Sequence, residues 1–62
     1  MASPAKPEDN EAAAQIARAA ARLFARRGFE ATSTREIVEE AKVAKPTLYY
    51  HFGSKEGLAK SL

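Results

Sequence analysis

Basic, hydroxyl-bearing and aromatic residues are concentrated between Thr34 and Lys55 of this 62-residue chain. Arg35 carries a planar guanidinium that can donate to two acceptors at once, such as those on a guanine edge or a phosphate. Lys45 has a reach similar to that of Arg35 but presents a single point charge. Thr47 offers a methyl group that suits a thymine methyl and a hydroxyl group that suits a phosphate. These side chains are therefore suited to contacts with a nucleic acid.

Two alternatives to nucleic-acid contact apply to the same stretch. Arg35 can be a solvated residue that pairs with Glu39, one helical turn later. Tyr49 and Tyr50 are adjacent and cannot both face a small core, so one of them is expected to contact a partner. That partner can also be a helix of another protein, which would make the chain an interaction module. Salt separates the two hypotheses, because phosphate contacts weaken steeply with salt whereas an aromatic-anchored protein interface changes little.

Catalytic and metal-binding chemistry is not indicated by the sequence. The chain has no cysteine and one histidine, His51, without a second ligand at a suitable spacing. Ser33 and Ser54 occupy positions where helix caps are needed, so neither is expected to be a nucleophile. We therefore expect no catalytic residue, no cofactor and no metal, and for His51 a hydrogen bond to a phosphate or to a backbone carbonyl.

Charge is distributed unevenly along the chain. Residues 1–11 hold one lysine against three acidic residues, whereas the remainder holds nine basic against five acidic residues and is compatible with nucleic-acid binding. No stretch approaches the roughly 18 to 20 apolar residues that span a bilayer, and the N-terminus lacks the apolar run of a secretory signal. A membrane-surface helix over residues 11–27 is disfavoured because alanine buries little area. We expect a cytoplasmic protein with a disordered tail over residues 1–10.

Start and stop signals predict the first two helices. Apolar residues recurring every three or four positions predict a helix over residues 11–27. Gly28 can take the positive φ of a helix C-cap, and Phe29 can then fold back onto Phe24 or Ala25. The run Ser33-Thr34-Arg35-Glu36 is a capping box, and it predicts a second helix of about two turns.

Pro46 predicts the next boundary, because proline is tolerated in the first turn of a helix but not in its interior. A third helix is predicted over residues 45–52, Gly53 can end it, and Ser54 can cap a fourth. No segment has the period of a strand. The expected fold is an all-α, three-helix helix-turn-helix bundle plus the start of a fourth helix, over residues 11–62. The expected core consists of Ile16, Ala20, Leu23, Phe24, Phe29, Ile37, Val38, Val43, Leu48, Phe52 and Leu58.

The residues from Ala20 onward, as an ordered set, resemble the N-terminal domain of TetR-type transcriptional repressors. The resemblance covers about four-fifths of the chain. It rests on Leu23-Phe24, Gly28-Phe29, Thr32-Ser33-Thr34, Thr47-Leu48-Tyr49-Tyr50-His51-Phe52 and Ser54-Lys55-Glu56.

The resemblance implies a DNA reader whose third helix enters the major groove of double-stranded DNA. It also implies a further helical domain, absent from these residues, that binds a small-molecule effector and forms a homodimer on a palindromic operator, and we expect this chain alone to be a monomer. Implied phosphate contacts are His51 and Lys55. The other implied contacts are Thr34, Arg35, Lys45, Pro46, Thr47 and Tyr49, and the exposed neighbour Tyr50 completes the predicted site.

Two positions depart from the pattern of the resembled family. Lys42 stands where a glycine is common in the turn, which costs about 1 kcal/mol if the backbone there has a positive φ. Ala44 stands where a serine often precedes the third helix, and the lost N-cap is typically worth about 1 kcal/mol. Both departures are expected to make the third helix less secure.

Overall fold

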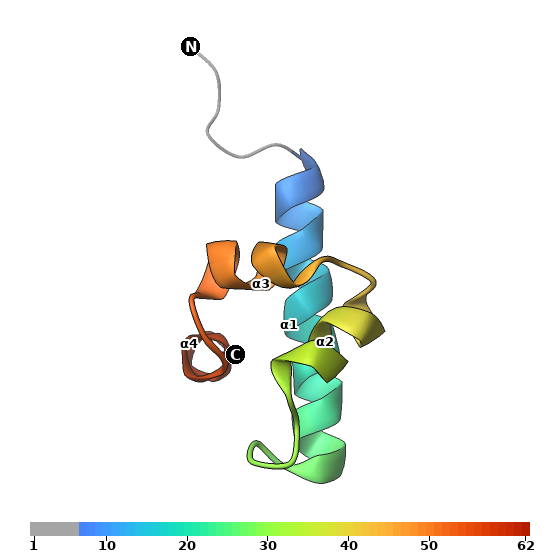
Figure 1. The fold of residues 1–62 in the computed structure, drawn as a ribbon, viewed down its shortest axis with the longest axis vertical. Coiled ribbons are helices and arrows are strands. Elements are labelled where there is room, and N and C mark those ends of the chain that lie inside the picture. The colour runs from blue at the N-terminus through green and yellow to red at the C-terminus, as the bar shows by residue number, and fades with distance from the viewer. Residues whose placement is uncertain (1–6) are drawn as a thin grey trace.

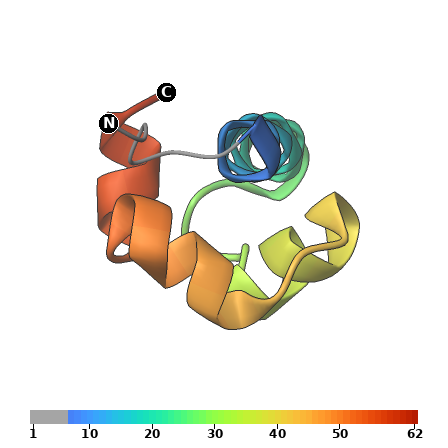
Figure 2. The same cartoon turned by 90° about the horizontal axis from the view of Figure 1, so that it is seen from above.

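The structure is a computed structural model that describes the backbone of residues 7–62 and the side chains of residues 11–62. All regular structure between residues 7 and 62 is helical, in four helices: α1 (Pro7–Arg27), α2 (Thr34–Ala41), α3 (Lys45–Phe52) and α4 (Lys55–Lys60). The three short helices form an arc around one side of the long helix α1 (Figures 1 and 2). This arrangement confirms the predicted all-α fold.

Helix α1 begins earlier than the sequence analysis predicted. Its first residue is Pro7, four residues before the expected start at Glu11. Proline is tolerated there because the first amides of a helix have no intrahelical partner. Residues 7–10 of the expected tail thus belong to α1, and the rest of that tail, residues 1–6, lies outside the described residues.

The end of α1 has the predicted geometry. Gly28 has a φ of 89° and donates its amide to the carbonyl of Phe24 at 2.7 Å. The ring of Phe29 folds back to lie 5.4 Å from that of Phe24, centroid to centroid. Phe29 itself is only half-buried and lies outside the core, because its ring covers the exposed end of α1.

The start of α2 is the predicted capping box. The Ser33 hydroxyl accepts from the Glu36 amide at 3.2 Å, and the Glu36 carboxylate accepts from the Ser33 amide at 3.1 Å. Two amides that would otherwise lack partners are thereby satisfied. This fixes the first turn of α2, which carries Thr34 and Arg35.

The turn between α2 and α3 contains both departures that the sequence analysis identified. Lys42 adopts the left-handed conformation, with φ 61° and ψ 44°, at the C-cap of α2. The N-cap of α3 is Ala44, which has no side-chain hydrogen bond to the helix. The turn therefore has the geometry that glycine and serine would favour, but with residues that make it less stable.

One hydrophobic core joins the four helices. α3 contributes a single buried residue, Leu48, and α4 contributes Leu58. Phe24, Val43 and Phe52, which were expected in the core, are partly buried and pack against its edge. The buried apolar residues are Ile16, Ala19, Ala20, Leu23, Ile37, Val38, Ala41, Leu48 and Leu58.

Helix α4 approaches the end of α3 closely. A Cβ atom at Gly57 would clash with the backbone carbonyl of Phe52, so only glycine fits at this position without a shift of the backbone. Ser54 caps α4 by accepting from the Gly57 amide at 2.9 Å. None of the helices between residues 7 and 62 combines the length and apolar character needed to cross a bilayer.

Candidate nucleic-acid interface

Helix α3 presents most of its side chains to solvent. Leu48 is fully buried, whereas Lys45 and Pro46 are exposed and Thr47 is half-buried. Tyr50 is 73% exposed, and it is the most exposed of the large apolar side chains in residues 11–62. A short helix held by one buried leucine therefore offers basic, hydroxyl and aromatic groups to a partner.

The start of α2 and the middle of α3 meet through a pair of hydroxyl groups. The Oγ1 atom of Thr34 lies 3.3 Å from the hydroxyl oxygen of Tyr49. Tyr49 is 43% exposed, so part of it remains accessible to a partner. Thr34 and Tyr49, two residues of the predicted site on different helices, thus lie side by side. We call the surface formed by Thr34, Arg35, Lys45, Pro46, Thr47, Tyr49 and Tyr50 the α2–α3 face.

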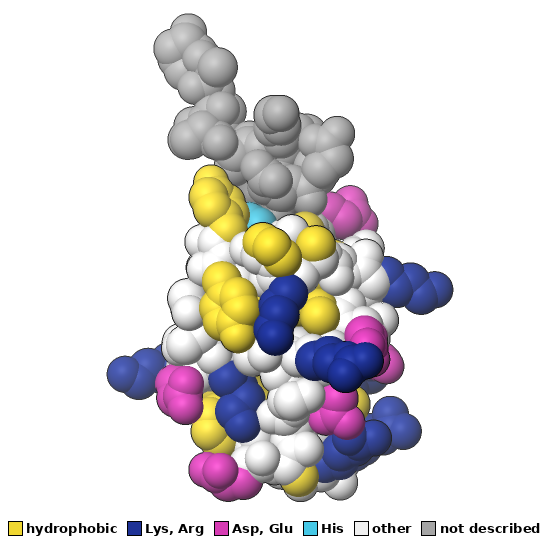
Figure 3. All heavy atoms as spheres, in the orientation of Figure 1, with side chains coloured by type: hydrophobic (Ala, Val, Ile, Leu, Met, Phe, Trp, Pro, Cys, Tyr) yellow, Lys and Arg dark blue, Asp and Glu magenta, His cyan; other side chains and the backbone are white. Residues whose placement is uncertain are grey.

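Figure 3 views the molecule from the side of α2 and α3. Apolar side chains gather over α3 with a basic side chain among them, and acidic side chains lie mainly toward α2 and the lower edge of the view. An anionic partner would accordingly meet less repulsion over α3 than over the outer surface of α2.

Arg35 forms the ion pair that the sequence left open as an alternative. Its Nε atom donates to the Glu39 carboxylate at 3.1 Å, and the two side chains are 79% and 62% exposed. Exposed pairs of this kind contribute only about 0.3 to 0.5 kcal/mol on a helix. The guanidinium can therefore leave Glu39 for another anion at small cost.

The other two carboxylates of α2 bind arginines of α1. Glu40 pairs with Arg22 at 3.1 Å, and Glu36 pairs with Arg27. The pKa of Glu36 is held below its ordinary value, first by the backbone hydrogen bond from Ser33 and then by the hydrogen bond from Arg27. These cross-helix pairs were not predicted from the sequence, because periodicity along one helix does not reveal which of its residues face another helix.

His51 lies beside two aromatic rings. Its ring centroid is 5.0 Å from that of Tyr50 and 6.1 Å from that of Phe52. Its Nε2 atom is buried and has no hydrogen-bond partner among the described residues. The predicted bond from His51 to a backbone carbonyl is not formed by this atom, and the phosphate contact stays a prediction.

Lys55 points toward the turn between α1 and α2. Its Nζ atom donates to the carbonyl oxygens of Phe29 at 2.9 Å and Thr32 at 3.0 Å, and it lies 4.2 Å from the centroid of the Phe29 ring. These contacts of Lys55 were not predicted from the sequence, since no local pattern links residues so far apart. The predicted contact of Lys55 with a phosphate is not tested by this geometry.

The described part of the chain offers little to a metal ion or a small substrate. Residues 11–62 contain no group of three histidine, cysteine or acidic residues that could hold a metal. Two surface depressions are shallow, and charged side chains of α1 and α2 line most of their walls. Neither depression is lined by a residue of the α2–α3 face.

The family to which the chain belongs follows from comparison with known proteins. The family model described as "Bacterial regulatory proteins, tetR family" matches residues 16–62, which include the end of α1, the helix-turn-helix unit and α4. The chain belongs to the TetR family. The resemblance noted in the sequence is thereby confirmed, and this TetR-family chain is a helix-turn-helix DNA-binding domain of a transcriptional regulator.

Curated relatives support the same assignment. The chain is 44% identical over 52 residues, 84% of its length, to the uncharacterized HTH-type transcriptional regulator YerO of Bacillus subtilis, of which it covers 18%. It is 45% identical over 47 residues, 76% of its length, to the A-factor receptor protein of Streptomyces griseus, of which it covers 17%. It is 39% identical over all 62 residues to the HTH-type transcriptional regulator TtgR of Pseudomonas putida, of which it covers 30%.

The chain thus spans less than a third of the length of these TetR-family relatives. No solved structure matches it significantly. The match falls on the helix-turn-helix unit and its flanking helices, so the DNA-binding part is the part that the relatives share with this chain.

Proposed function

We propose that this chain reads one half-site of double-stranded DNA by inserting α3 into the major groove. The observation that carries the proposal is the exposure of α3 beside the start of α2. Leu48 is the buried residue of α3 and Phe52 packs at the edge of the core, whereas the outward side chains are basic, hydroxyl-bearing and aromatic. The major groove is wide enough for a helix and displays a distinct pattern of donors and acceptors for each base pair. A short helix with an unoccupied outer surface suits that groove.

The base-reading residues in this proposal are Arg35, Lys45 and Thr47. Arg35 exchanges Glu39 for a guanine edge or a phosphate, at the small cost of an exposed ion pair. Lys45, in the first turn of α3, reaches a guanine or a phosphate, and Thr47 meets a thymine methyl. Pro46, Tyr49 and Tyr50 supply apolar contact, and the Thr34 and Tyr49 hydroxyls, 3.3 Å apart, are directed at the same phosphate region.

Two residues beside the α2–α3 face are proposed phosphate contacts. His51 follows Tyr50 in the last turn of α3, and Lys55 begins α4. Two of the three ammonium protons of Lys55 are used by carbonyl oxygens, which leaves one for a phosphate. Such contacts fix the position of a protein on the duplex without selecting sequence.

The remaining proposals concern the whole protein. We propose a homodimeric regulator of the bacterial cytoplasm that binds a palindromic operator, with the dimer interface and the site for a small-molecule effector outside these residues. One relative is named as a receptor, the A-factor receptor protein of Streptomyces griseus, which is compatible with an effector site. In this proposal the protein is not an enzyme and uses no cofactor or metal.

The test is a titration of the 62-residue chain against a fluorescent pool of random-sequence 20-base-pair duplexes at several salt concentrations. We expect a dissociation constant of about 10⁻⁴ to 10⁻⁶ M at physiological salt, with log affinity falling linearly with log salt. On random-sequence duplexes the acceptors of Arg35 and Lys45 are mainly phosphates, so Arg35→Ala and Lys45→Ala should each reduce the salt slope by about one. Lys60→Ala, in an exposed position of α4, is the control of equal charge change and should have less effect.

The result decides between the two classes of partner. No salt-dependent binding at 50 mM salt, where phosphate contacts are strongest, would overturn the DNA proposal in favour of a protein-interaction module built on Tyr49 and Tyr50. Equal slopes for all three variants would show that binding is not localised to the α2–α3 face. If binding is salt-dependent and localised to the α2–α3 face, selection of the bound sequences from the pool gives the half-site.

A further inference from the structure

The ammonium group of Lys55 joins two segments that are far apart in the sequence. Lys55 is the first residue of α4, where a positive charge is disfavoured by the helix dipole. Its side chain leaves α4 and donates to the carbonyl oxygens of Phe29 and Thr32, at 2.9 Å and 3.0 Å. The Phe29 ring, 4.2 Å from Nζ, adds a cation–π contact. The start of α4 is thereby tied to the turn between α1 and α2.

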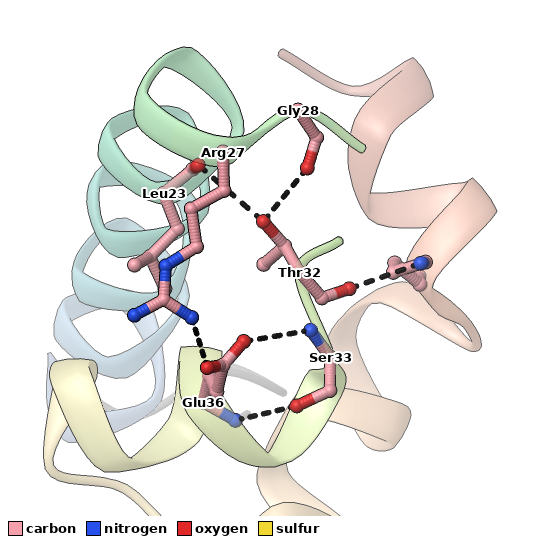
Figure 4. Close-up of polar contacts among 7 residues, drawn as sticks. Leu23, Arg27, Gly28, Thr32, Ser33 and Glu36 are labelled. Carbon is pink, nitrogen blue, oxygen red and sulfur yellow. Dashed lines mark hydrogen bonds and ion pairs between the residues drawn. The ribbon is translucent and has the colours of Figure 1, made fainter. Parts of the chain in front are cut away.

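The carbonyl of Thr32 belongs to a peptide group that is held at both ends. Its oxygen accepts from Lys55, and the amide on its other side, that of Ser33, donates to the Glu36 carboxylate at 3.1 Å (Figure 4). Hydrogen bonds at the two ends of one peptide group polarise and strengthen each other. Because Ser33 is the N-cap of α2, the orientation of this peptide group determines where α2 begins.

The side chain of Thr32 fixes the same turn to α1. It is 1% exposed, and its hydroxyl lies 2.8 Å from the Gly28 carbonyl and 3.3 Å from the Leu23 carbonyl. Figure 4 shows Thr32 between the end of α1 and the capping box of α2. The turn is therefore anchored on one side by Thr32 and on the other side by Lys55.

We propose that Lys55 is a positioning residue for DNA reading. By holding the peptide group between Thr32 and Ser33, it fixes the first turn of α2 and with it Thr34 and Arg35. This role is separate from the phosphate contact proposed above, and it rests on the proposed function only where it concerns DNA binding. α4 and the DNA-reading start of α2 are thus mechanically connected through one side chain.

The first test uses the DNA-free chain and a matched pair of variants. Lys55→Met keeps the length and apolar stem of the side chain but removes the ammonium, and Lys60→Met makes the same change later in α4. In ¹⁵N-labelled protein, we expect Lys55→Met to shift the amides of residues 29–36 and to raise their hydrogen exchange roughly fivefold, with Lys60→Met leaving them unchanged. Equal effects of the two variants on residues 29–36 would overturn the proposal.

The second test uses the wild-type chain, so it does not depend on the folding of a variant. The ¹⁵Nζ–H signals of the lysines report how fast each ammonium exchanges protons with water. We expect slow exchange for Lys55, which has two carbonyl partners, and fast exchange for the exposed Lys42, Lys45 and Lys60. Exchange of Lys55 at the rate of Lys60 would contradict the proposal.

DNA titrations separate the positioning role from a phosphate contact alone. If Lys55 positions α2, Lys55→Met should lower affinity for the random duplex pool about threefold even at the highest salt at which binding is measured, where phosphate contacts are weakest. The opposite outcome is a lower salt slope with no loss of affinity at high salt, and amide shifts and exchange rates of residues 29–36 equal to those of the wild type. It would assign Lys55 to a phosphate contact only and overturn the proposal. Absence of any binding by the wild type would instead count against the proposed function and leave the DNA-free tests valid.

Discussion

At the scale of single residues, the free chain keeps its predicted DNA-binding groups in weak or partial contacts of its own. Arg35 pairs with Glu39 in an exposed ion pair, and the Thr34 and Tyr49 hydroxyls lie together at 3.3 Å. These contacts are weak enough to be exchanged for contacts with a phosphate or a base. Glu39 is therefore a competitor for the guanidinium that the DNA proposal needs.

Removal of this competitor should strengthen DNA binding. Glu39→Gln should raise affinity for random duplex DNA about threefold at low salt, because Arg35 no longer has to leave a carboxylate and a negative charge near the phosphates is lost. Glu40→Gln is the matched control, since Glu40 is the neighbouring carboxylate and pairs with Arg22 on α1 instead. Titrations by fluorescence anisotropy measure the DNA affinity of both variants. Equal gains in affinity would show that the loss of a negative charge, and not the release of Arg35 from Glu39, strengthens binding.

Glu36 predicts a pH dependence of stability. Its pKa is lowered in the folded chain from an ordinary value of 4.5, by the Ser33 amide and by Arg27. The stabilisation is fully present above pH 4.5 and is lost as the pH falls through the lowered folded pKa. Glu36→Gln keeps an acceptor for the capping box and removes the charge.

We therefore expect the wild type to exceed Glu36→Gln in urea midpoint at pH 7, and the difference to shrink as the pH falls below 4.5 and through the lowered folded pKa of Glu36. Urea unfolding followed by circular dichroism at a series of pH values measures it. A difference that stayed constant with pH would mean that the ionised carboxylate of Glu36 does not contribute to stability.

At the scale of elements, helix α3 is the least secured of the short helices. Its N-cap residue, Ala44, has no side-chain atom that can accept a hydrogen bond from a helix amide, whereas Ser33 and Ser54 cap α2 and α4 in this way. The preceding turn also holds Lys42 in the left-handed conformation. The attachment of α3 to the core thus depends on the buried Leu48, with Phe52 packed at the edge of the core.

Restoring a cap should stabilise the domain. Ala44 already has the extended backbone of an N-cap, φ −83° and ψ 151°, so Ala44→Thr should raise the free energy of unfolding by about 1 kcal/mol. Ala44→Val has nearly the same shape without the hydroxyl and is the control. Urea unfolding measures the free energy of unfolding of both variants. An equal gain in Ala44→Val would assign the stabilisation to the β-branched side chain instead of the cap.

The sequence predicted the element boundaries well where a local signal exists. The capping box at Ser33, the proline at residue 46 and the cap at Ser54 predicted the starts of the three short helices as the structure has them. The start of α1 was predicted too late because Pro7 was assigned to the tail, although proline is also common in a first turn. Local capping and turn chemistry determine boundaries, so they can be read without tertiary information.

The contacts between elements could not be predicted in the same way. Nothing in the local sequence links Lys55 to the carbonyl of Thr32, or Arg22 to Glu40, because each depends on how two helices cross. The site residues came from resemblance and from exposure on a helix face, and DNA contact by each of them stays a prediction. The chemistry of the side chains indicated a nucleic acid as partner. For Arg35 the sequence left two alternatives open, a nucleic-acid contact and an ion pair with Glu39, and the DNA-free structure contains the ion pair.

At the scale of the whole molecule, a small core holds four helices so that α2 and α3 present the outward α2–α3 face. The radius of gyration of the Cα atoms is 11.5 Å. Hydrogen bonds with Leu23 of α1, Glu36 of α2 and Lys55 of α4 hold the turn between α1 and α2. A domain of this size buries only about 60% of its unfolded surface, so individual hydrogen bonds matter to its stability. The connections around Thr32 therefore contribute directly to the geometry of the α2–α3 face.

DNA reading by α3 is tested most directly by an NMR titration of the ¹⁵N-labelled chain with a random-sequence 20-base-pair duplex at 50 mM salt. We predict that the largest amide shifts fall on residues 34–35 and 45–51, and that they diminish when the salt is raised to 300 mM. Residues 16–23 of α1 should change little. Shifts concentrated on α1, or shifts at Tyr49 and Tyr50 that are insensitive to salt, would contradict the account of α3 as a DNA-reading helix.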